Sequence, residues 1–331
     1  MKLSMESNNK IKFTLIVGTV ILTVLTIFSF FVGRYPLTLS GIISGDSRQW
    51  QVFVTLRASR GIGGCIGGFV LGVAGFVFQT VFRNPLASPD IIGVSSGASA
   101  GAAFGILFLS GSMAVTASAF AGALGSVVLA LMLASLTAGQ DGRGIVLAGI
   151  AVHSLAQTAL IFLKLLADPE KQLASIEYWI MGSLNGISRD SLAIPFFTTL
   201  AGFIIMAMLY RQVLILSTSE EEAVSLGVNV TILRFIILML ATLVVSSIIC
   251  VTGLISFIGL IATHIARLLT KRNDIFTYIT SGFTGAILLT LADILARSVS
   301  TSELPVSIFT SLLGAPLLII LLIRANKKEG L

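Results

Sequence analysis

Long hydrophobic stretches without charge alternate with short charged segments along the whole chain. Eight such stretches contain between 18 and 50 residues each. A helix needs about 20 apolar residues to cross a bilayer, so the 50-residue stretch before Asp141 can hold two helices. The 32-residue stretch between Arg234 and Arg267 can also hold two if both extend beyond these charges. The pattern therefore predicts ten transmembrane helices, at approximately residues 12–33, 61–82, 91–109, 114–137, 144–166, 192–210, 229–250, 254–270, 275–296 and 305–323.

The basic residues indicate how these helices are oriented. If the N-terminus is cytoplasmic, 13 of the 21 Lys and Arg residues lie on the cytoplasmic side and 8 on the other. Cytoplasmic connections of membrane proteins carry an excess of Lys and Arg. An even number of spans also places both termini on one side. We therefore predict a multi-pass protein of the cytoplasmic (plasma) membrane with both termini in the cytoplasm.

The composition supports the same fold class, an all-α integral membrane protein. Hydrophobic residues make up 55% of the 331 residues and charged residues only 11%, whereas soluble domains carry about 25% charged residues. This excludes a soluble enzyme or a nucleic-acid-binding protein, so we expect no nucleic-acid partner. The sequence contains no phosphate-binding loop of the form G-x-x-x-x-G-K-S/T and leaves no room for an ATPase domain. Uphill transport would therefore need an ion gradient or a separate ATPase subunit.

Few side chains are suited to catalysis or metal binding. His153 and His264 are the two histidines, and neither has Cys, Asp or Glu at ligand spacing. Cys65 and Cys250 both lie in apolar runs, where free thiols are expected. We expect no catalytic residue, no metal site and no cofactor. Asp293 and Arg297 are four residues apart on one helix, which predicts a local ion pair near the outer surface.

A short amphipathic helix is predicted on the cytoplasmic side, between the sixth and seventh spans. Residues 217–228 read STSEEEAVSLGV. Acidic side chains in the first turn of a helix are favoured by its dipole, and a glycine can end it. Two interpretations remain open, a solvated loop helix or a docking helix for a cytoplasmic protein. The candidate docking residues are Glu221, Glu222, Ala223, Leu226 and Gly227.

Small residues open the third predicted helix, where residues 93–103 read GVSSGASAGAA. Gly93 and Gly97 lie four residues apart, with a further glycine at 101, and so form one stripe on a helix. Ser95, Ser96 and Ser99 lie elsewhere on the same helix. The stripe indicates close helix packing, and the hydroxyl groups indicate the lining of a translocation pathway. Both interpretations remain open.

Several segments together resemble the FecCD-type family, the permease subunits of ABC importers for iron siderophores, heme and vitamin B12. Residues 83–98 read RNPLASPDIIGVSSGA, which follows a motif characteristic of that family. Further matching segments lie at residues 147–151, 179–184, 222–228, 253–267, 303–306 and 314–316. Leu254 and Thr263 stand where the family often has proline, and Ser256 and Ser307 where it often has glycine. The resemblance spans residues 12–323, in order.

This resemblance implies a ten-helix, BtuC-like ABC importer permease fold in a bacterial membrane. It implies a second permease subunit, identical or homologous, and a cytoplasmic ABC ATPase dimer docked on residues 219–228. It also implies an extracytoplasmic siderophore-binding protein, with glutamates that meet arginines on the permease. The matching arginines are Arg57, Arg60 and Arg297.

The expected cargo is a ferric siderophore, and heme or cobalamin is the alternative within the family. An alternative of another class is an ion-coupled secondary transporter. Such transporters usually carry charged residues in the middle of their spans. Here the interiors of the predicted spans are nearly free of charge, with Lys164 and Asp293 near predicted ends. A membrane-embedded enzyme would need clustered acid, base or nucleophilic side chains at membrane depth, which two scattered histidines do not supply. The sequence therefore favours the ABC permease.

Overall fold

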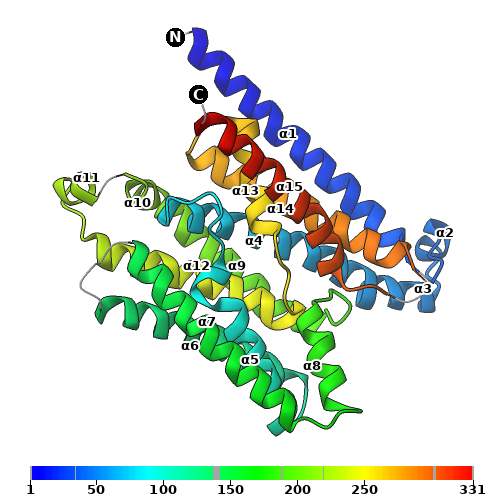
Figure 1. The fold of residues 1–331 in the computed structure, drawn as a ribbon. Coiled ribbons are helices and arrows are strands. Elements are labelled where there is room, and N and C mark those ends of the chain that lie inside the picture. The colour runs from blue at the N-terminus through cyan, green and yellow to red at the C-terminus, as the bar shows by residue number, and fades with distance from the viewer. Residues whose placement is uncertain are drawn as a thin grey trace.

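The computed structural model describes residues 2–33, 35–136, 142–187, 189–218, 220–300 and 303–329. This part of the chain consists of helices joined by turns and short irregular segments, without strands (Figure 1). The long helices are α1 Lys2–Phe31, α4 Ser59–Val81, α5 Val94–Phe108, α6 Ser112–Leu136, α7 Gly142–Leu166, α9 Arg189–Met208, α12 Val230–Thr252, α13 Ile258–Thr270, α14 Ile275–Ser298 and α15 Val306–Glu329. The short ones are α2 Leu39–Ile43, α3 Ser47–Val52, η1 Phe53–Ala58, η2 Pro89–Ile92, α8 Gln172–Met181, α10 Tyr210–Ile215 and α11 Glu220–Ser225.

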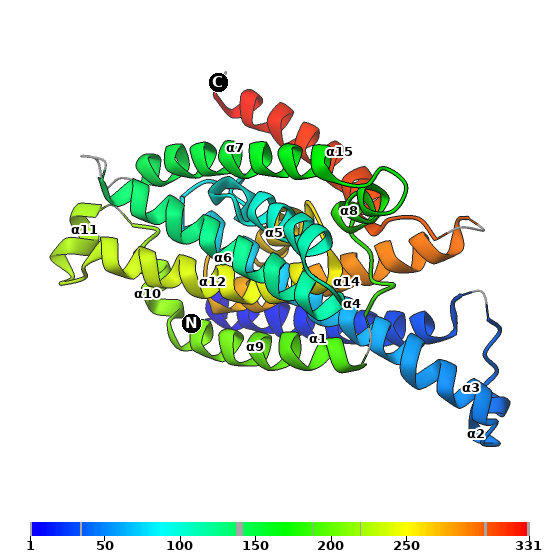
Figure 2. The ribbon, with the colours of Figure 1, turned by 90° about the horizontal axis from the view of Figure 1, so that it is seen from below.

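The long helices run side by side in a bundle with two distinct ends. Helix α1 begins and α15 ends at the same end of the bundle as α10 and α11 (Figure 1). The short helices α2, α3 and α8 lie at the opposite end, which is also clear in the view from below (Figure 2). The chain thus begins and ends its helical part on one side, as expected for an even number of passes.

Among the described residues, six helical segments are long and apolar enough to cross a membrane. These are Lys12–Phe31, Ser47–Val81, Ser112–Leu136, Gly144–Leu166, Val230–Thr252 and Ile275–Ser298. Four shorter apolar segments lie at Val94–Phe108, Phe196–Met208, Ile258–Thr270 and Val306–Ile320. Apolar helices overlap all ten predicted positions, and within the described residues six of them have the length of a membrane span. The protein is an all-α, multi-pass integral membrane protein.

Helix α4 forms the centre of the bundle and α1 its edge. In an apolar stretch of 18 residues taken from each span, 78% of the residues are buried in the segment that contains α4, but only 6% in α1. Small residues let the neighbours of α4 approach closely. A Cβ atom at Gly72 would collide with the backbone of Ser281 in α14, and one at Gly75 would collide with the backbone of Gly259 in α13. The core therefore depends on direct backbone contact between helices.

The second span begins earlier than the sequence predicts. The expected start was residue 61, because Arg57 and Arg60 are charged. Instead α3, η1 and α4 form one continuous helical segment, Ser47–Val81. Asp46 caps its start by accepting hydrogen bonds from the amides of Arg48 and Gln49, and these bonds lower the pKa of the Asp46 carboxyl.

The eighth predicted span is helical over only part of its length. Residues 254–270 are expected to be helical, but α12 ends at Thr252 and α13 begins at Ile258. Gly253 has φ +71 and Phe257 has φ +68, so both residues adopt left-handed conformations that interrupt the helix. The five residues between the helices form an irregular segment. Non-helical backbone of this kind is tolerated in a membrane protein where protein buries it or where it lines a cavity.

Candidate functional site

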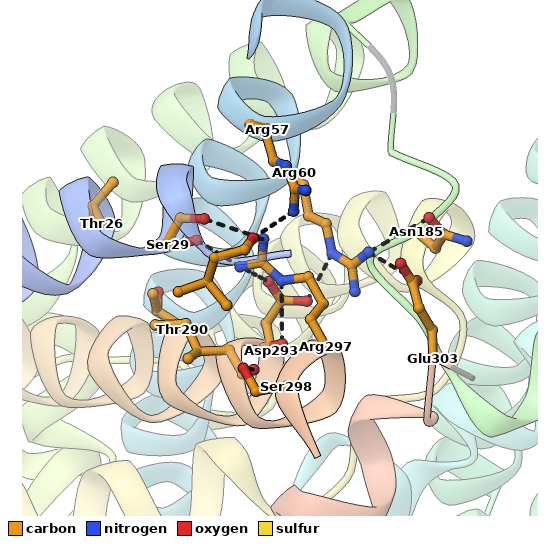
Figure 3. A network of polar contacts seen from close by, with 12 residues as sticks. Thr26, Ser29, Arg57, Arg60, Asn185, Thr290, Asp293, Arg297, Ser298 and Glu303 are labelled. Carbon is orange, nitrogen blue, oxygen red and sulfur yellow. Dashed lines mark hydrogen bonds and ion pairs between the residues drawn. The ribbon is translucent and has the colours of Figure 1, made fainter. Parts of the chain in front are cut away.

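Five ionisable side chains form a charged network at the end of the bundle that carries α8 (Figure 3). They are Arg57, Arg60, Asp293, Arg297 and Glu303. Arg60 Nε lies 2.9 Å from Asp293 Oδ1, and Arg60 Nη1 lies 2.9 Å from Glu303 Oε2. Arg297 Nη2 lies 2.8 Å from Asp293 Oδ2. The predicted ion pair between Asp293 and Arg297 is therefore confirmed, and it belongs to a larger cluster.

The same arginines also hold the end of α1 through its backbone. Arg297 donates to the carbonyl oxygens of Ser29 at 3.1 Å and Val32 at 3.0 Å, and to Ser29 Oγ at 2.7 Å. Arg57 also donates to the carbonyl oxygen of Val32. Three arginines thus fasten α1, the Ser47–Val81 segment and α14 to one another. Hydrogen bonds from charged donors are stronger than neutral ones, so this end of the bundle is held firmly.

The three arginines that the family resemblance assigns to binding-protein contact are buried. Arg57 is only 9% exposed, Arg60 6% and Arg297 5%. Their burial is possible because the carboxylates of Asp293 and Glu303 offset the cost of removing guanidinium groups from water. The network nevertheless reaches the surface, since the Glu303 side chain is 29% exposed. The five side chains carry a net charge of +1.

The sequence analysis missed two parts of this network. Asn185 follows α8 and accepts a hydrogen bond from Arg60 Nη1 at 3.4 Å. Glu303 stands in the ELPV segment that contributes to the family resemblance, but its local sequence does not indicate a partner 243 residues away. Only the folded chain brings these groups together.

Helix α11 lies at the opposite end of the bundle and carries the candidate docking residues. Glu221, Glu222 and Leu226 are exposed, the last at 63%. Ala223, although a candidate docking residue, is buried at 1% and faces the bundle, so it does not belong to the exposed face of α11. Val224, which the sequence analysis did not select, is 63% exposed and supplies the second apolar side chain of that face.

Gly227 ends this segment in a left-handed turn. Its φ is +77, its amide donates to Val224 at 2.9 Å, and the amide of Val228 donates to Ala223 at 3.2 Å. An added Cβ would meet nothing within 4 Å, so space does not require glycine at this position. The backbone conformation does, because a β-branched residue is strained at this φ.

Helix α5 shows how the predicted glycine stripe is used. A Cβ at Gly97 would collide with Ser126 and the backbone of Gly122 in α6, and one at Gly101 with the backbone of Ser118. Gly93 does not belong to this stripe, contrary to the prediction, because α5 begins at Val94. It has φ +83 and forms the turn between η2 and α5.

The three candidate serines of α5 differ in exposure. Ser96 and Ser99 are each 2% exposed and donate to the backbone carbonyls of Gly93 and Ser95, so in this subunit the packing interpretation fits them better than the lining of a pathway. Ser95 donates to the carboxylate of Asp90. Ser95 and Asp90 line a cavity of about 180 Å³ together with the irregular residues 255–257. Of the three, Ser95 is the one placed at a cavity.

Comparison with known proteins identifies the family of the chain. Residues 21–324 match the model of the FecCD transport family. The Fe(3+)-citrate import permease YfmE of Bacillus subtilis is 32% identical, over 99% of this chain and 100% of its own. The hemin transport permease HmuU of Yersinia pestis is 30% identical, over 98% of this chain and 99% of its own.

A solved structure supports the same assignment. An inward-facing transporter of the metal-chelate ABC type superposes with a TM-score of 0.84 at 31% identity. The match covers 95% of this chain and 99% of that chain. The protein is thus a transport permease subunit and not a catalytic enzyme, and the chain belongs to the FecCD transport family of ABC importer permeases.

Proposed function

We propose that the protein is the permease subunit of a binding-protein-dependent importer that carries ferric siderophores across the cytoplasmic membrane of a bacterium. The observation that carries this proposal is the full-length match to a family whose members include an Fe(3+)-citrate permease. Heme is the second candidate, because the hemin permease is similar over the same length. Family membership disfavours an ion-coupled secondary transporter.

In this proposal both termini and α11 face the cytoplasm, and the charged network faces the outside. The division of basic residues, 13 against 8, supports this orientation. A separate ATPase dimer docks on α11 through Glu221, Glu222, Val224 and Leu226. Ala223 holds the helix against the bundle, and Gly227 ends it. Two carboxylates beside two exposed apolar side chains suit a protein partner with a basic rim around an apolar centre.

The binding protein docks on the outer end, above the charged network. Arg57, Arg60 and Arg297 act there from beneath the surface, because they are buried. The net positive charge of the network attracts an acidic partner surface, and this attraction raises the rate of encounter. A second permease subunit, identical or homologous, completes the pathway, and α5 borders it at Ser95. Gly93, Gly97, Ser96 and Ser99 support that helix through packing and turn formation.

Uptake by the complete transporter tests this function. The permease is assembled with its ATPase and binding protein in proteoliposomes, and ATP-dependent uptake of ⁵⁵Fe-labelled chelates, labelled heme and labelled cobalamin is compared. We expect uptake of at least one ferric siderophore and no uptake without ATP. Uptake of heme alone, or of cobalamin alone, would contradict the siderophore proposal. ATP-independent uptake driven by an ion gradient would contradict the ABC mechanism.

A further inference from the structure

A cavity of about 420 Å³ opens beside α8, next to the charged network. Its walls come from α8, α5, the end of α12 and the segment after α8. Gly186 lies on its rim, and the neighbouring Asn185 bonds to Arg60. The cavity, here named the α8 cavity, is therefore at the end of the bundle that faces outward in the proposed orientation. Cargo released by a binding protein would reach this end first.

The wall between α8 and α12 is held by close backbone contacts. Gly182 has φ +70, and a Cβ there would collide with the carbonyl oxygen of Leu254. A Cβ at Gly253 would collide with the carbonyl oxygen of Trp179. The amide of Ser183 donates to the carbonyl of Thr252 at 2.7 Å. The backbone turns at Gly182 and Gly253 pack directly against each other, so the fold itself fixes the position of this wall of the cavity.

Helix α8 is also fastened along its length. Lys164 of α7 forms an ion pair of 2.9 Å with Glu177 of α8. Ile176 is 1% exposed and packs in a cluster between α5, α7 and α8. These contacts fix the angle of α8, so the cavity wall formed by Tyr178 and Trp179 has a defined position.

The chemistry of the lining is aromatic and hydroxylic. Tyr178 and Trp179 supply two ring systems, and Tyr178 is 51% exposed and so accessible. Ser175, Ser183 and Thr252 supply hydroxyl groups, and the Tyr178 hydroxyl donates to Ser183 Oγ at 3.4 Å. Rings bind flat carbon surfaces, and hydroxyl groups can donate to or accept from carbonyl and amide groups. Among the residues that the structure describes, none that lines the cavity carries a charged side chain.

The absence of charge from this lining determines which cargo it can accept. An anionic group that enters the α8 cavity loses water and gains no cation from the lining, and Arg60 beside the rim is already paired with Asp293 and Glu303. Its entry is therefore unfavourable. An uncharged group loses little and gains ring and hydroxyl contacts. We propose that the α8 cavity binds one face of an electrically neutral ferric chelate, such as a ferric tris-hydroxamate, and disfavours polyanionic chelates. This inference rests on the proposed function and specifies its substrate class.

Fluorescence of Trp179 measures binding directly. The chain has two tryptophans, so Trp50→Phe leaves Trp179 as the only tryptophan of this subunit. In the assembled transporter in lipid nanodiscs, its signal is the part that is lost when Trp179→Phe is added. The probes are the Ga³⁺ complexes of a neutral tris-hydroxamate and of a trianionic tris-catecholate, because Ga³⁺ does not quench fluorescence as Fe³⁺ does. We expect a saturable change with the neutral complex at concentrations about tenfold lower than with the trianion. Equal responses to both, or a response to the trianion alone, would overturn the inference.

A charge placed in the cavity tests the same inference by transport. Ser175 is exposed on α8, so Ser175→Lys adds one positive charge to the lining without disturbing the core. We expect the uptake ratio of trianionic to neutral ferric chelate to rise about tenfold. Glu170→Gln changes the net charge by the same amount at an exposed position outside the lining, and should leave the ratio unchanged. Equal ratios in the two variants would overturn the inference while ferric uptake still supported the proposed function. Failure to take up any ferric chelate would overturn both.

Discussion

At the scale of single residues, each buried arginine of the charged network that lies beside Asp293 is paired with its carboxylate. Arg60 and Arg297 share the carboxylate of Asp293, which is itself 1% exposed. Asp293 therefore holds two buried guanidinium groups, and neither arginine could remain buried at low cost without it. Glu303 is a weaker member of the network, because its side chain is partly exposed to solvent.

We expect Asp293→Asn to destabilise the protein far more than Glu303→Gln. The first variant leaves two buried arginines without a carboxylate between them and should cost about 3–5 kcal/mol. The second removes a partly exposed partner and should cost about 1 kcal/mol or less. Thermal denaturation of the purified variants in detergent gives both midpoints. Equal midpoints would mean that Asp293 is not the centre of the network.

At the scale of helices, the hydrophobic pattern predicted more than the charges did. Ten long helices follow from uncharged stretches alone, because a bilayer requires spans of that length. The continuation of the second span past Arg60 could not be predicted, since its partner Asp293 lies 233 residues away. The short helix α8 and the irregular residues 253–257 were missed for a similar reason. Their conformations depend on contact between Gly182 and Gly253, which no local pattern encodes.

The candidate sites also divide into features that the local sequence predicts and features that depend on contacts in the folded chain. Exposure of Leu226 follows from a local amphipathic pattern, and the structure agrees with it. Burial of Ser96 and Ser99 depends on where α5 meets its neighbours, which spacing along the chain does not reveal. The glycine stripe indicated correctly where α5 packs against α6, because two helix backbones can come this close only at small residues. The positions of the serines did not indicate which hydroxyl groups face solvent.

Gly72 and Gly125 provide a matched test of helix packing. Gly72→Ala places a Cβ against the backbone of Ser281, so α4 and α14 must separate. We expect a loss of about 1–3 kcal/mol in stability. Gly125→Ala in α6 meets nothing within 4 Å, and alanine favours a helix over glycine. Its midpoint of thermal denaturation should be unchanged or higher, and a comparable loss in both variants would contradict this view of the core.

At the scale of the whole molecule, the two ends of the bundle have different characters. The charged network, the α8 cavity and the capped helix α3 occupy one end. Helix α11, with two carboxylates and two exposed apolar side chains, occupies the other. This polarity suits a subunit that meets one partner on each side of a membrane.

Labelling with a membrane-impermeant maleimide tests the orientation. Cys65 and Cys250, both free in the structure, are first replaced by alanine. A cysteine is then introduced at Arg48 near the charged network or at Glu221 in α11, both exposed positions. In intact cells we expect Arg48→Cys to react and Glu221→Cys to react only after the membrane is opened. The reverse pattern would show that the bundle is inserted the other way.

The long separation between Arg60 and Asp293 has a consequence for biosynthesis. The ribosome completes Arg60 233 residues before Asp293, a delay of roughly 10–50 s at typical rates of synthesis. During that interval the arginine has no buried carboxylate to accompany it into lipid. We therefore expect the early end of the second span to wait at the membrane surface or beside the insertion machinery until Asp293 arrives. The last third of the polypeptide would then complete the insertion of the first.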